Sequence, residues 1–341
     1  MKNLLFDLCK LSGVSGDEGE VARYCADYIK KYTDNVYVDF NNNLTAVVGN
    51  LSADKTVMLD AHLDRIGFIV TEVDERGFLR VDKVGGVDLR TVLDAPVVIY
   101  GKRTLFGTVC CMPPHLSDGN EDKAVTIDRV IIQPEEITDE NGKSIIPEIV
   151  SAGDCVTFYS EPVELLGDRV SCAALDNRAG VAAVLRAVDY ISDLEINARV
   201  IVSLTSQEET YAAGAKTAAF LYEPDECICV DVSFAAQPGI SDQYASVKLG
   251  EGAMLCISPN LNREMFNALR GVCEENNIKY QLEVCNGRTG TNADHIAVSR
   301  SGVKTAVVSV PEKNMHTQAE IVSLADIEST AALIREYLRR R

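Results

Sequence analysis

The sequence has no long hydrophobic run. No segment approaches the ~18 consecutive apolar residues that a membrane span requires, so we expect no membrane attachment. The first eight residues include Asp7 within an apolar stretch, which indicates an amphipathic helix rather than a signal peptide. There is neither an internal repeat nor a low-complexity segment. These absences are typical of a globular protein, and we expect it in the cytoplasm.

Positive charge is also scarce. The 33 Lys and Arg residues face 51 Asp and Glu residues, which gives a formal net charge of −18. A surface this acidic repels phosphate backbones, so no nucleic-acid partner is expected. Bound divalent metal could neutralise part of the charge, and we interpret the rest as solvated surface.

The sequence also lacks a CxxC motif. Its 11 cysteines are scattered, and the closest of them, Cys110-Cys111 and Cys227-Ile228-Cys229, have the wrong spacing for such a zinc or redox motif. Without a secretory leader, we interpret them as buried thiols that stay reduced in the cytoplasm.

The chain has 341 residues, a length that favours two domains. The pattern of expected strands and helices changes along it. Residues 67–161 carry short strands separated by turns such as Asp74-Glu75-Arg76-Gly77, which predict a small β-barrel or sandwich, and we expect the barrel. On either side, apolar strands alternate with helices. This pattern predicts an α/β fold with a mixed, mostly parallel sheet flanked by helices. We therefore expect a catalytic domain of residues 1–66 and 162–341 with an inserted β domain, 67–161.

Individual elements follow from periodicity and turn residues. Helices are expected at residues 3–11, 18–32, 174–190, 212–221, 261–274, 293–300 and from 324 onward. Strands of the sheet are expected at 36–38, 44–48, 57–61, 200–205, 227–232, 280–284 and 305–310. Strands of the barrel are expected at 68–73, 78–81, 97–100, 105–111, 125–132 and 155–159.

Residue types that bind metals follow four of the apolar strands. They are His62, the pair Glu208-Glu209, Asp231 and His316, and Asp176 joins them from the start of a predicted helix. In an open, mostly parallel sheet, ligands bind beyond the carboxyl ends of the strands. All of these positions except His316 also have an ordinary structural explanation: a capped turn for His62, an N-cap for Asp176 or Asn177, the first turn of a helix for the glutamates, and a turn for Asp231. His115 and His295 fit a loop and a helix rather than a ligand set.

The combination suits a pair of divalent cations. Two metals roughly 3.5–4 Å apart need a bridging carboxylate, terminal ligands and a bridging water. Two imidazoles and three carboxylates nearly cancel the charge of such a pair, which leaves the water acidic enough to be a nucleophile near neutral pH. Of two adjacent glutamates, one could bind metal while the other takes the proton from the water. Asp64 is placed to accept the other N–H of His62.

Several motifs now make a family recognisable. They are Ala61-His62-Leu63-Asp64-Arg65-Ile66-Gly67-Phe68, Ala174-Leu175-Asp176-Asn177-Arg178-Ala179-Gly180, Ser206-Gln207-Glu208-Glu209, Val230-Asp231-Val232, Gly290-Thr291-Asn292-Ala293 and Met315-His316-Thr317. The chain resembles, over nearly its whole length, the glutamyl/tetrahedral (TET) aminopeptidase family of dinuclear metallopeptidases, which includes proteins labelled endoglucanase-like. Gly85-Gly86-Val87-Asp88-Leu89-Arg90 and Pro113-Pro114-His115-Leu116 fit the inserted domain of that family.

The resemblance implies a role for each site residue. Asp176 bridges two metals, His62 and Asp231 complete one site, and Glu209 and His316 complete the other. Glu208 is the general base. The spacing of Asp64 from His62, rather than the resemblance, predicts that Asp64 supports catalysis beside His62. The expected metals are Zn²⁺ or Co²⁺, the substrates are peptides that lose single N-terminal residues, and the assembly is a dodecamer built from dimers through the inserted domain.

The sequence departs from the usual family pattern at a few positions. Arg65 stands where an acid is common, Thr210-Tyr211 where Val-Gly is usual, Ala213 where Arg is frequent, and Asn292 at a frequent Asp position. All ligand and base positions are intact, so we expect metal binding and hydrolysis to persist. The preferred N-terminal residue does not follow from the family name.

Three other functions are weighed against this one. A deacylase or carboxypeptidase could use the same metal core on a different amide. A glycosidase needs two carboxyl groups about 5–10 Å apart across the sugar bond, an arrangement that adjacent Glu208 and Glu209 do not provide and that leaves the histidines unexplained. A non-catalytic assembly protein is the fourth possibility, which the changes at Arg65 and Tyr211 leave open.

Overall fold

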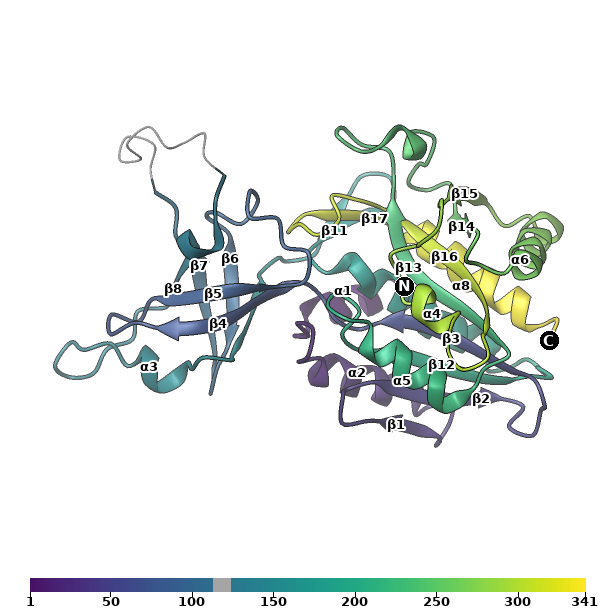
Figure 1. Ribbon diagram of the computed structural model, residues 1–341, viewed down its shortest axis with the longest axis horizontal. Helices are drawn as coiled ribbons and strands as arrows, with labels where there is room; N and C mark the ends of the chain where they lie inside the picture. Colours follow the sequence, from purple (N-terminus) through teal and green to yellow (C-terminus); the bar gives the residue numbers. More distant parts are fainter. Residues whose placement is uncertain (113–123) are drawn as a thin grey trace.

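The computed structural model describes residues 1–112 and 124–341, and the predicted loop residue His115 lies outside them. The chain forms a large α/β body from which a barrel projects to one side (Figure 1). The helices are α1 (Lys2–Lys10), α2 (Gly19–Ile29), α3 (Ile146–Ile149), α4 (Leu175–Ile191), α5 (Ala213–Tyr222), α6 (Arg263–Asn276), α7 (Ala293–Ile296) and α8 (Leu324–Leu338). None of these helices is both long and apolar enough to cross a membrane.

The α/β body is built on one mixed sheet. Its strands are β1 (Val36–Val38), β2 (Leu44–Gly49), β3 (Thr56–His62), β10 (Val163–Leu165), β11 (Arg169–Cys172), β12 (Arg199–Thr205), β13 (Glu226–Phe234), β14 (Ala253–Ile257), β15 (Tyr280–Val284), β16 (Lys304–Lys313) and β17 (Glu320–Ser323). The main path runs β1-β2-β12-β3-β13-β16-β17-β11-β10, and β14 and β15 branch from β16. The expected α/β architecture is confirmed.

The four central strands, β12, β3, β13 and β16, are parallel, whereas the strands at both ends of the main path are antiparallel. Thr205 at the end of β12 lies opposite His62 at the end of β3. The carboxyl ends of the central strands therefore meet at one edge of the sheet. This edge is the crevice that parallel sheets offer to ligands.

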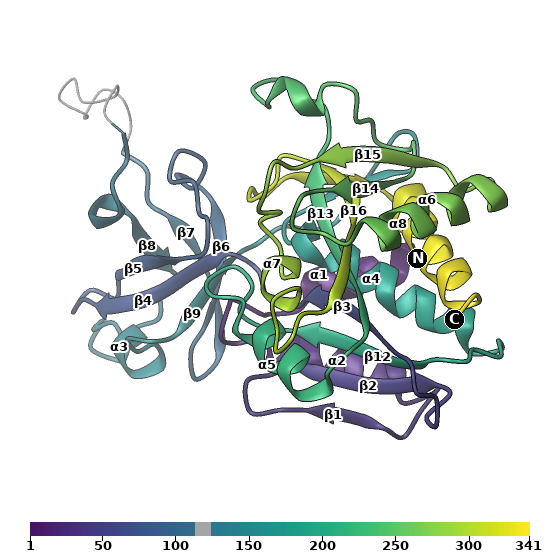
Figure 2. The same cartoon turned by 45° about the vertical axis from the view of Figure 1, so that its right-hand side comes forward.

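Helices cover both faces of the sheet (Figure 2). On β3, alternate residues Val57, Leu59 and Ala61 join the large core that includes α4 and α8, while Met58 packs with Ala215 and Ala219 of α5 on the other face. Burial on both faces explains why these strands are apolar runs with no polar alternation. Burial of these apolar segments determines where the strands lie. The polar residues at the strand ends can then form a binding site.

The barrel closes in the order β4-β5-β8-β7-β6-β9. Its strands are β4 (Gly67–Val73), β5 (Leu79–Val84), β6 (Pro96–Tyr100), β7 (Thr104–Val109), β8 (Ile131–Pro134) and β9 (Cys155–Phe158). Its first strand pairs with its last, with Phe68 opposite Val156. The chain thus enters and leaves the barrel side by side.

Several predicted bounds are wrong. The strand expected at 125–132 is a 3₁₀ turn, Ile127–Arg129, followed by β8. The helix expected at 293–300 ends at Ile296. The prediction also missed β10, β11, β14 and β17. Three of these strands are only three or four residues long, which is too short for periodicity to reveal them.

Candidate metal centre

His62, Asp176 and Asp231 converge at the carboxyl edge of the sheet. His62 is the last residue of β3, Asp231 lies in β13, and Asp176 lies at the start of α4. Nε2 of His62 lies 3.2 Å from Oδ1 of Asp176 and 3.5 Å from Oδ1 of Asp231. All three residues are buried. Their ligand atoms are close enough to hold one metal ion.

A second group shares Asp176. Its other oxygen, Oδ2, lies 3.1 Å from Nε2 of His316, and the same nitrogen is 3.4 Å from Oε1 of Glu209. These three residues could also hold one ion. Asp176 therefore presents one carboxylate oxygen to each group, as a carboxylate that bridges two metals must.

The spacing of these atoms fits metal ligands. Ligands about 2.0–2.1 Å from a tetrahedral zinc ion lie roughly 3.3–3.4 Å from one another. The four nitrogen–oxygen distances, 3.2, 3.5, 3.1 and 3.4 Å, fall around that value.

The two imidazoles are also oriented for metal binding. Nδ1 of His62 lies 3.2 Å from the carbonyl oxygen of Asp64, and Nδ1 of His316 lies 3.3 Å from the carbonyl oxygen of Gly86. With the proton on Nδ1, each Nε2 turns its lone pair toward carboxylate oxygens. A proton or a metal ion between these atoms would satisfy them, and only a metal ion can be shared by all three ligand atoms of a group.

Electrostatics indicate the same demand for positive charge. Burial, together with the nearby carboxylates of Asp231, Glu209 and Asp176, raises the pKa of Glu208 to about 9 against the opposing effect of His62. Burial lowers the pKa of His62, but contacts with Asp176 and Asp231 outweigh it and raise that pKa well above its usual value. Both shifts favour the protonated form of the group, so the centre favours added positive charge, which divalent cations would also supply.

Two buried carboxylates hold the turn that carries Glu208 and Glu209. Asp64 accepts the N–H groups of both glutamates, each at 3.0 Å, and Glu18 accepts the N–H of Gln207 at 3.0 Å. Oδ1 of Asp64 also lies 3.4 Å from Nδ1 of His62. Asp64 thus contacts His62 as expected. It also orients both glutamates, a role that the sequence did not indicate.

The structure decides between Asp176 and Asn177, the two candidates for the N-cap of α4. Asp176 and Asn177 both have non-helical backbone angles. Oδ1 of Asn177 accepts the N–H of Gly180 at 3.0 Å, as an N-cap residue does. The carboxylate of Asp176 instead faces His62 and His316, so an N-cap role does not account for it.

Other residues singled out in the sequence lie outside the two groups. Glu208 belongs to neither, although it shares the turn with Glu209. His295 lies in α7, and Thr210 and Tyr211 are exposed. Asn292 donates from Nδ2 to Asp60 of β3 at 2.9 Å and to Thr205 of β12 at 2.8 Å, and this buried network is next to His62, which pairs with Thr205 in the sheet.

Glu320 is a site residue that the sequence analysis missed. Its Oε2 accepts the N–H of Asp176 at 3.2 Å, and its Oε1 accepts the N–H of His316 at 2.9 Å. One buried carboxylate thus fixes the backbone of a residue in each metal-ligand group. Its position four residues after His316 was the available signal.

We expect Glu320→Gln to weaken metal binding by about 10–100-fold, because an amide cannot accept both N–H groups and partners of metal ligands have effects of this order. The measurement is the free Zn²⁺ concentration that gives half-maximal activity. Glu336→Gln, another buried glutamate that pairs with Arg335 away from the centre, is the control. Equal metal requirements in the two variants would contradict a positioning role for Glu320.

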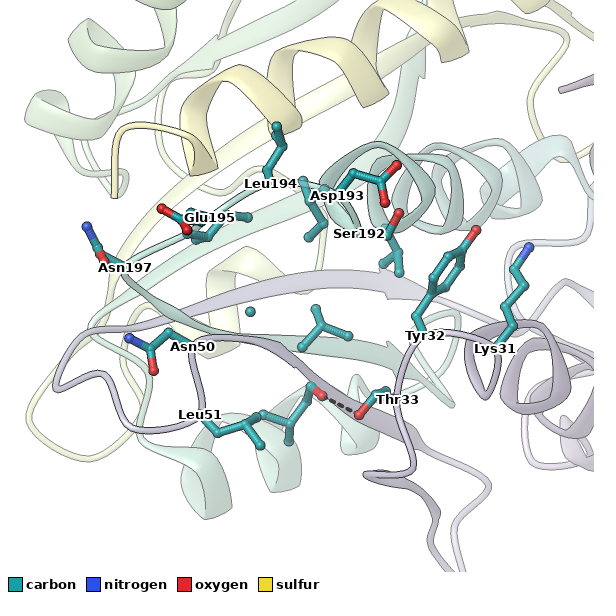
Figure 3. Close-up of a pocket in the computed structure, with 16 residues that line it drawn as sticks. Lys31, Tyr32, Thr33, Asn50, Leu51, Ser192, Asp193, Leu194, Glu195 and Asn197 are labelled. Atoms are coloured by element: carbon teal, nitrogen blue, oxygen red, sulfur yellow. Dashed lines mark hydrogen bonds between the residues drawn. The ribbon is translucent and has the colours of Figure 1, made fainter.

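A large cavity elsewhere contains none of these residues (Figure 3). Its volume is about 790 Å³, and residues 31–33, 47–51 and 191–197 with Val188 line it. It lies beside the carboxyl end of α4, whereas Asp176 lies at the opposite end. The cavity is therefore separate from the candidate centre.

Comparison with known proteins identifies the class. A model of the M42 glutamyl aminopeptidase family matches residues 42–333, and the chain belongs to this family of metallopeptidases. The expected family membership is confirmed, and the aminopeptidase type of hydrolase is the class that the match supports.

Individual relatives agree with this class. The lysyl aminopeptidase of Pyrococcus furiosus is 30% identical over 98% of this chain and 96% of its own length. The structure of a TET aminopeptidase from Thaumarchaeota archaeon SCGC AB-539-E09 is 28% identical, covers 99% of this chain and 96% of that chain, and has a TM-score of 0.91. The Pyrococcus horikoshii TET1 peptidase is 28% identical, covers 99% and 98%, has a TM-score of 0.84, and can assemble into a tetrahedron or a large octahedral shell.

Proposed function

We propose that the protein is a two-metal aminopeptidase that removes N-terminal residues from peptides. The observation that carries the proposal is the position of Asp176, whose two oxygens face the imidazoles of two separate ligand groups. His62 and Asp231 would hold one ion with Asp176, and Glu209 and His316 would hold the other. Two Zn²⁺ or Co²⁺ ions, when bound, would polarise the scissile carbonyl and make water a nucleophile near neutral pH.

The protein itself would supply the proton transfer. We assign Glu208 as the general base that takes a proton from the attacking water and delivers it to the leaving amine. Asp64 orients Glu208 and Glu209 together through their backbone N–H groups. Because one carboxylate accepts both N–H groups, Glu208 and Glu209 would keep a fixed position relative to each other.

The direct test is hydrolysis of a panel of aminoacyl-nitroanilides. We expect activity to be lost on treatment with a chelator and to return with Zn²⁺ or Co²⁺, because the ligand groups need a cation to be functional. Metal content measured by mass spectrometry should approach two ions per subunit. Full activity in metal-free protein would contradict the proposal.

The same panel separates the related hydrolases. An aminopeptidase cleaves substrates with a free amino terminus and rejects their N-acylated forms, a deacylase does the reverse, and a carboxypeptidase attacks the other end. Cleavage of a cellulose oligosaccharide by metal-free protein would support a glycosidase instead. The panel also reveals the preferred N-terminal residue.

We also propose that residues 67–161 form an inserted domain that serves assembly, while residues 1–66 and 162–341 form the catalytic domain. The assembly of the Pyrococcus horikoshii relative supports an oligomer, and we propose a dodecamer built from dimers. Light scattering after size-exclusion chromatography measures the subunit number. All eleven cysteines are free thiols, which supports a reducing compartment such as the cytoplasm.

A further inference from the structure

A second cavity, of about 590 Å³, lies between the N-terminal helices and the barrel. It is lined from one side by the end of α1 and by α2, and from the other by β6, β7 and β9. Arg65, in the connection between β3 and β4, also lines it. No residue of the two metal-ligand groups takes part, so the cavity is distinct from the candidate centre.

Arg65 is almost fully buried, at 5% exposure, and is poorly satisfied. It makes a hydrogen bond from Nη2 to the carbonyl oxygen of Phe158 at 3.2 Å, and Nε has no partner in the described part of the chain. A buried guanidinium carries five donors and a full charge, and leaving them unpaired is costly. The side chain therefore has capacity for an anionic partner.

A second buried arginine increases this demand. Arg178 is fully buried and donates to the carbonyl oxygens of Leu8 and Ser12. Ser12 lines the same cavity as Arg65, and the N–H of Arg65 is bonded to the carbonyl oxygen of the next residue, Gly13, so the two guanidinium groups lie in one small region. Two guanidinium groups thus repel each other in the interior of a protein whose overall charge is −18. An anion beside Arg65 would relieve this repulsion.

The charged groups of the cavity other than Arg65 cancel one another, so Arg65 gives the lining its net positive charge. Arg23 and Lys10 line it together with Glu20 and Glu161. Glu20 already accepts the N–H of Ser12, and Glu161 accepts the hydroxyl of Tyr159 and pairs with Lys10 at 3.7 Å.

Among the described residues, neither Arg65 nor Arg23 has an ion pair within 4.0 Å. The hydroxyl groups of Tyr100 and Thr157, 3.3 Å apart, add neutral donors to the lining.

We propose that this cavity binds a small oxyanion, either phosphate or a carboxylate, with Arg65 as its principal contact and Arg23 as the second. Arginine is suited to both anions because its planar fork donates two parallel hydrogen bonds to their oxygens. The site binds independently of the metals and of peptide hydrolysis. The proposal therefore stands even if the activity proposed above is wrong.

Isothermal titration of the metal-loaded protein with potassium phosphate, and separately with acetate, tests it at constant ionic strength in chloride. We expect saturable binding of one anion per subunit. Arg65→Met should weaken binding by about tenfold or more, since a charged hydrogen bond contributes on that order, and Arg23→Gln should weaken it less. Arg263→Gln, which removes an exposed arginine on α6, should leave it unchanged.

Phosphate can also bind metal ions, so the titration is repeated after chelation. Retained binding supports the cavity, and loss of binding with the metals overturns it. If Arg65→Met fails to fold, Arg65→Glu decides, because a carboxylate there gives Arg178 a partner while excluding an anion. Unchanged binding in the folded Arg65 variant, or equal loss in Arg263→Gln, overturns the proposal. The ratio of the phosphate and acetate affinities identifies the preferred anion.

Discussion

Replacing Glu208 with glutamine should lower kcat for aminoacyl-nitroanilides by about 10²–10⁴-fold, the range that general acid–base catalysis contributes. Glutamine has nearly the shape of glutamate but cannot take a proton from water. Glu208 lies outside both ligand groups, so the metal content should stay at the wild-type level. The N–H of residue 208 remains bound to Asp64, so the turn should keep its conformation.

The neighbouring residue provides a matched control. Glu209→Gln changes the same functional group one position along the same turn, but it removes the negative charge from a carboxylate whose Oε1 lies 3.4 Å from Nε2 of His316. We expect this variant to lose metal as well as rate, and excess Zn²⁺ or Co²⁺ should restore part of it. If Glu208→Gln stayed fully active, or lost metal as Glu209→Gln does, Glu208 would not be the base.

Asp176→Asn should have an even broader effect, because one substitution disturbs both ligand groups. An amide offers one oxygen and one NH₂ group, so it cannot present an acceptor to both His62 and His316. We expect the metal content to fall by at least one ion per subunit. Activity should fall more than about a thousandfold, since each metal contributes several kcal/mol to stabilising the transition state.

The control for Asp176→Asn is the same change at another buried aspartate. Asp326 accepts the N–H groups of Gly250 and Gly252, each at 2.7 Å, away from the centre. Asp326→Asn should reduce the free energy of unfolding measured in urea but leave the metal content unchanged. If both variants lost metal equally, general destabilisation would explain the result and the bridging role of Asp176 would be wrong.

The sequence predicted the elements whose residues are buried on both faces or on one clear face. Val57 to Ala61 and Val200 to Leu204 are apolar runs because helices cover both sides of the sheet, and such runs are visible without a structure. The β10–β11 hairpin escaped prediction because β10 is three exposed residues long. Val125 and Ile127 suggested a strand, yet they are only partly buried against the barrel core from a turn.

Four of the metal-binding residues were predictable because they come at the ends of apolar strands, and the structure brings them together with Asp176 from the start of α4. The supporting contacts were not, because they depend on distances across the chain. Glu320 holds the N–H of Asp176, and Glu18 holds the N–H of Gln207, although neither pair is close in sequence. Asp64 was expected to contact a side chain, and its bonds to two backbone N–H groups depend on a turn whose shape a sequence does not reveal.

The barrel has a consequence for how readily the centre can form. His62 and Asp176 stand on opposite sides of the barrel in the sequence, and joining distant residues costs chain entropy that grows with the logarithm of the loop. Because Phe68 pairs with Val156, a folded barrel holds its own two ends together. Once the barrel has folded, the loop that must close between His62 and Asp176 consists only of the segments that join each of them to the barrel. A barrel that folds early would thus lower the entropic cost of bringing His62 and Asp176 together.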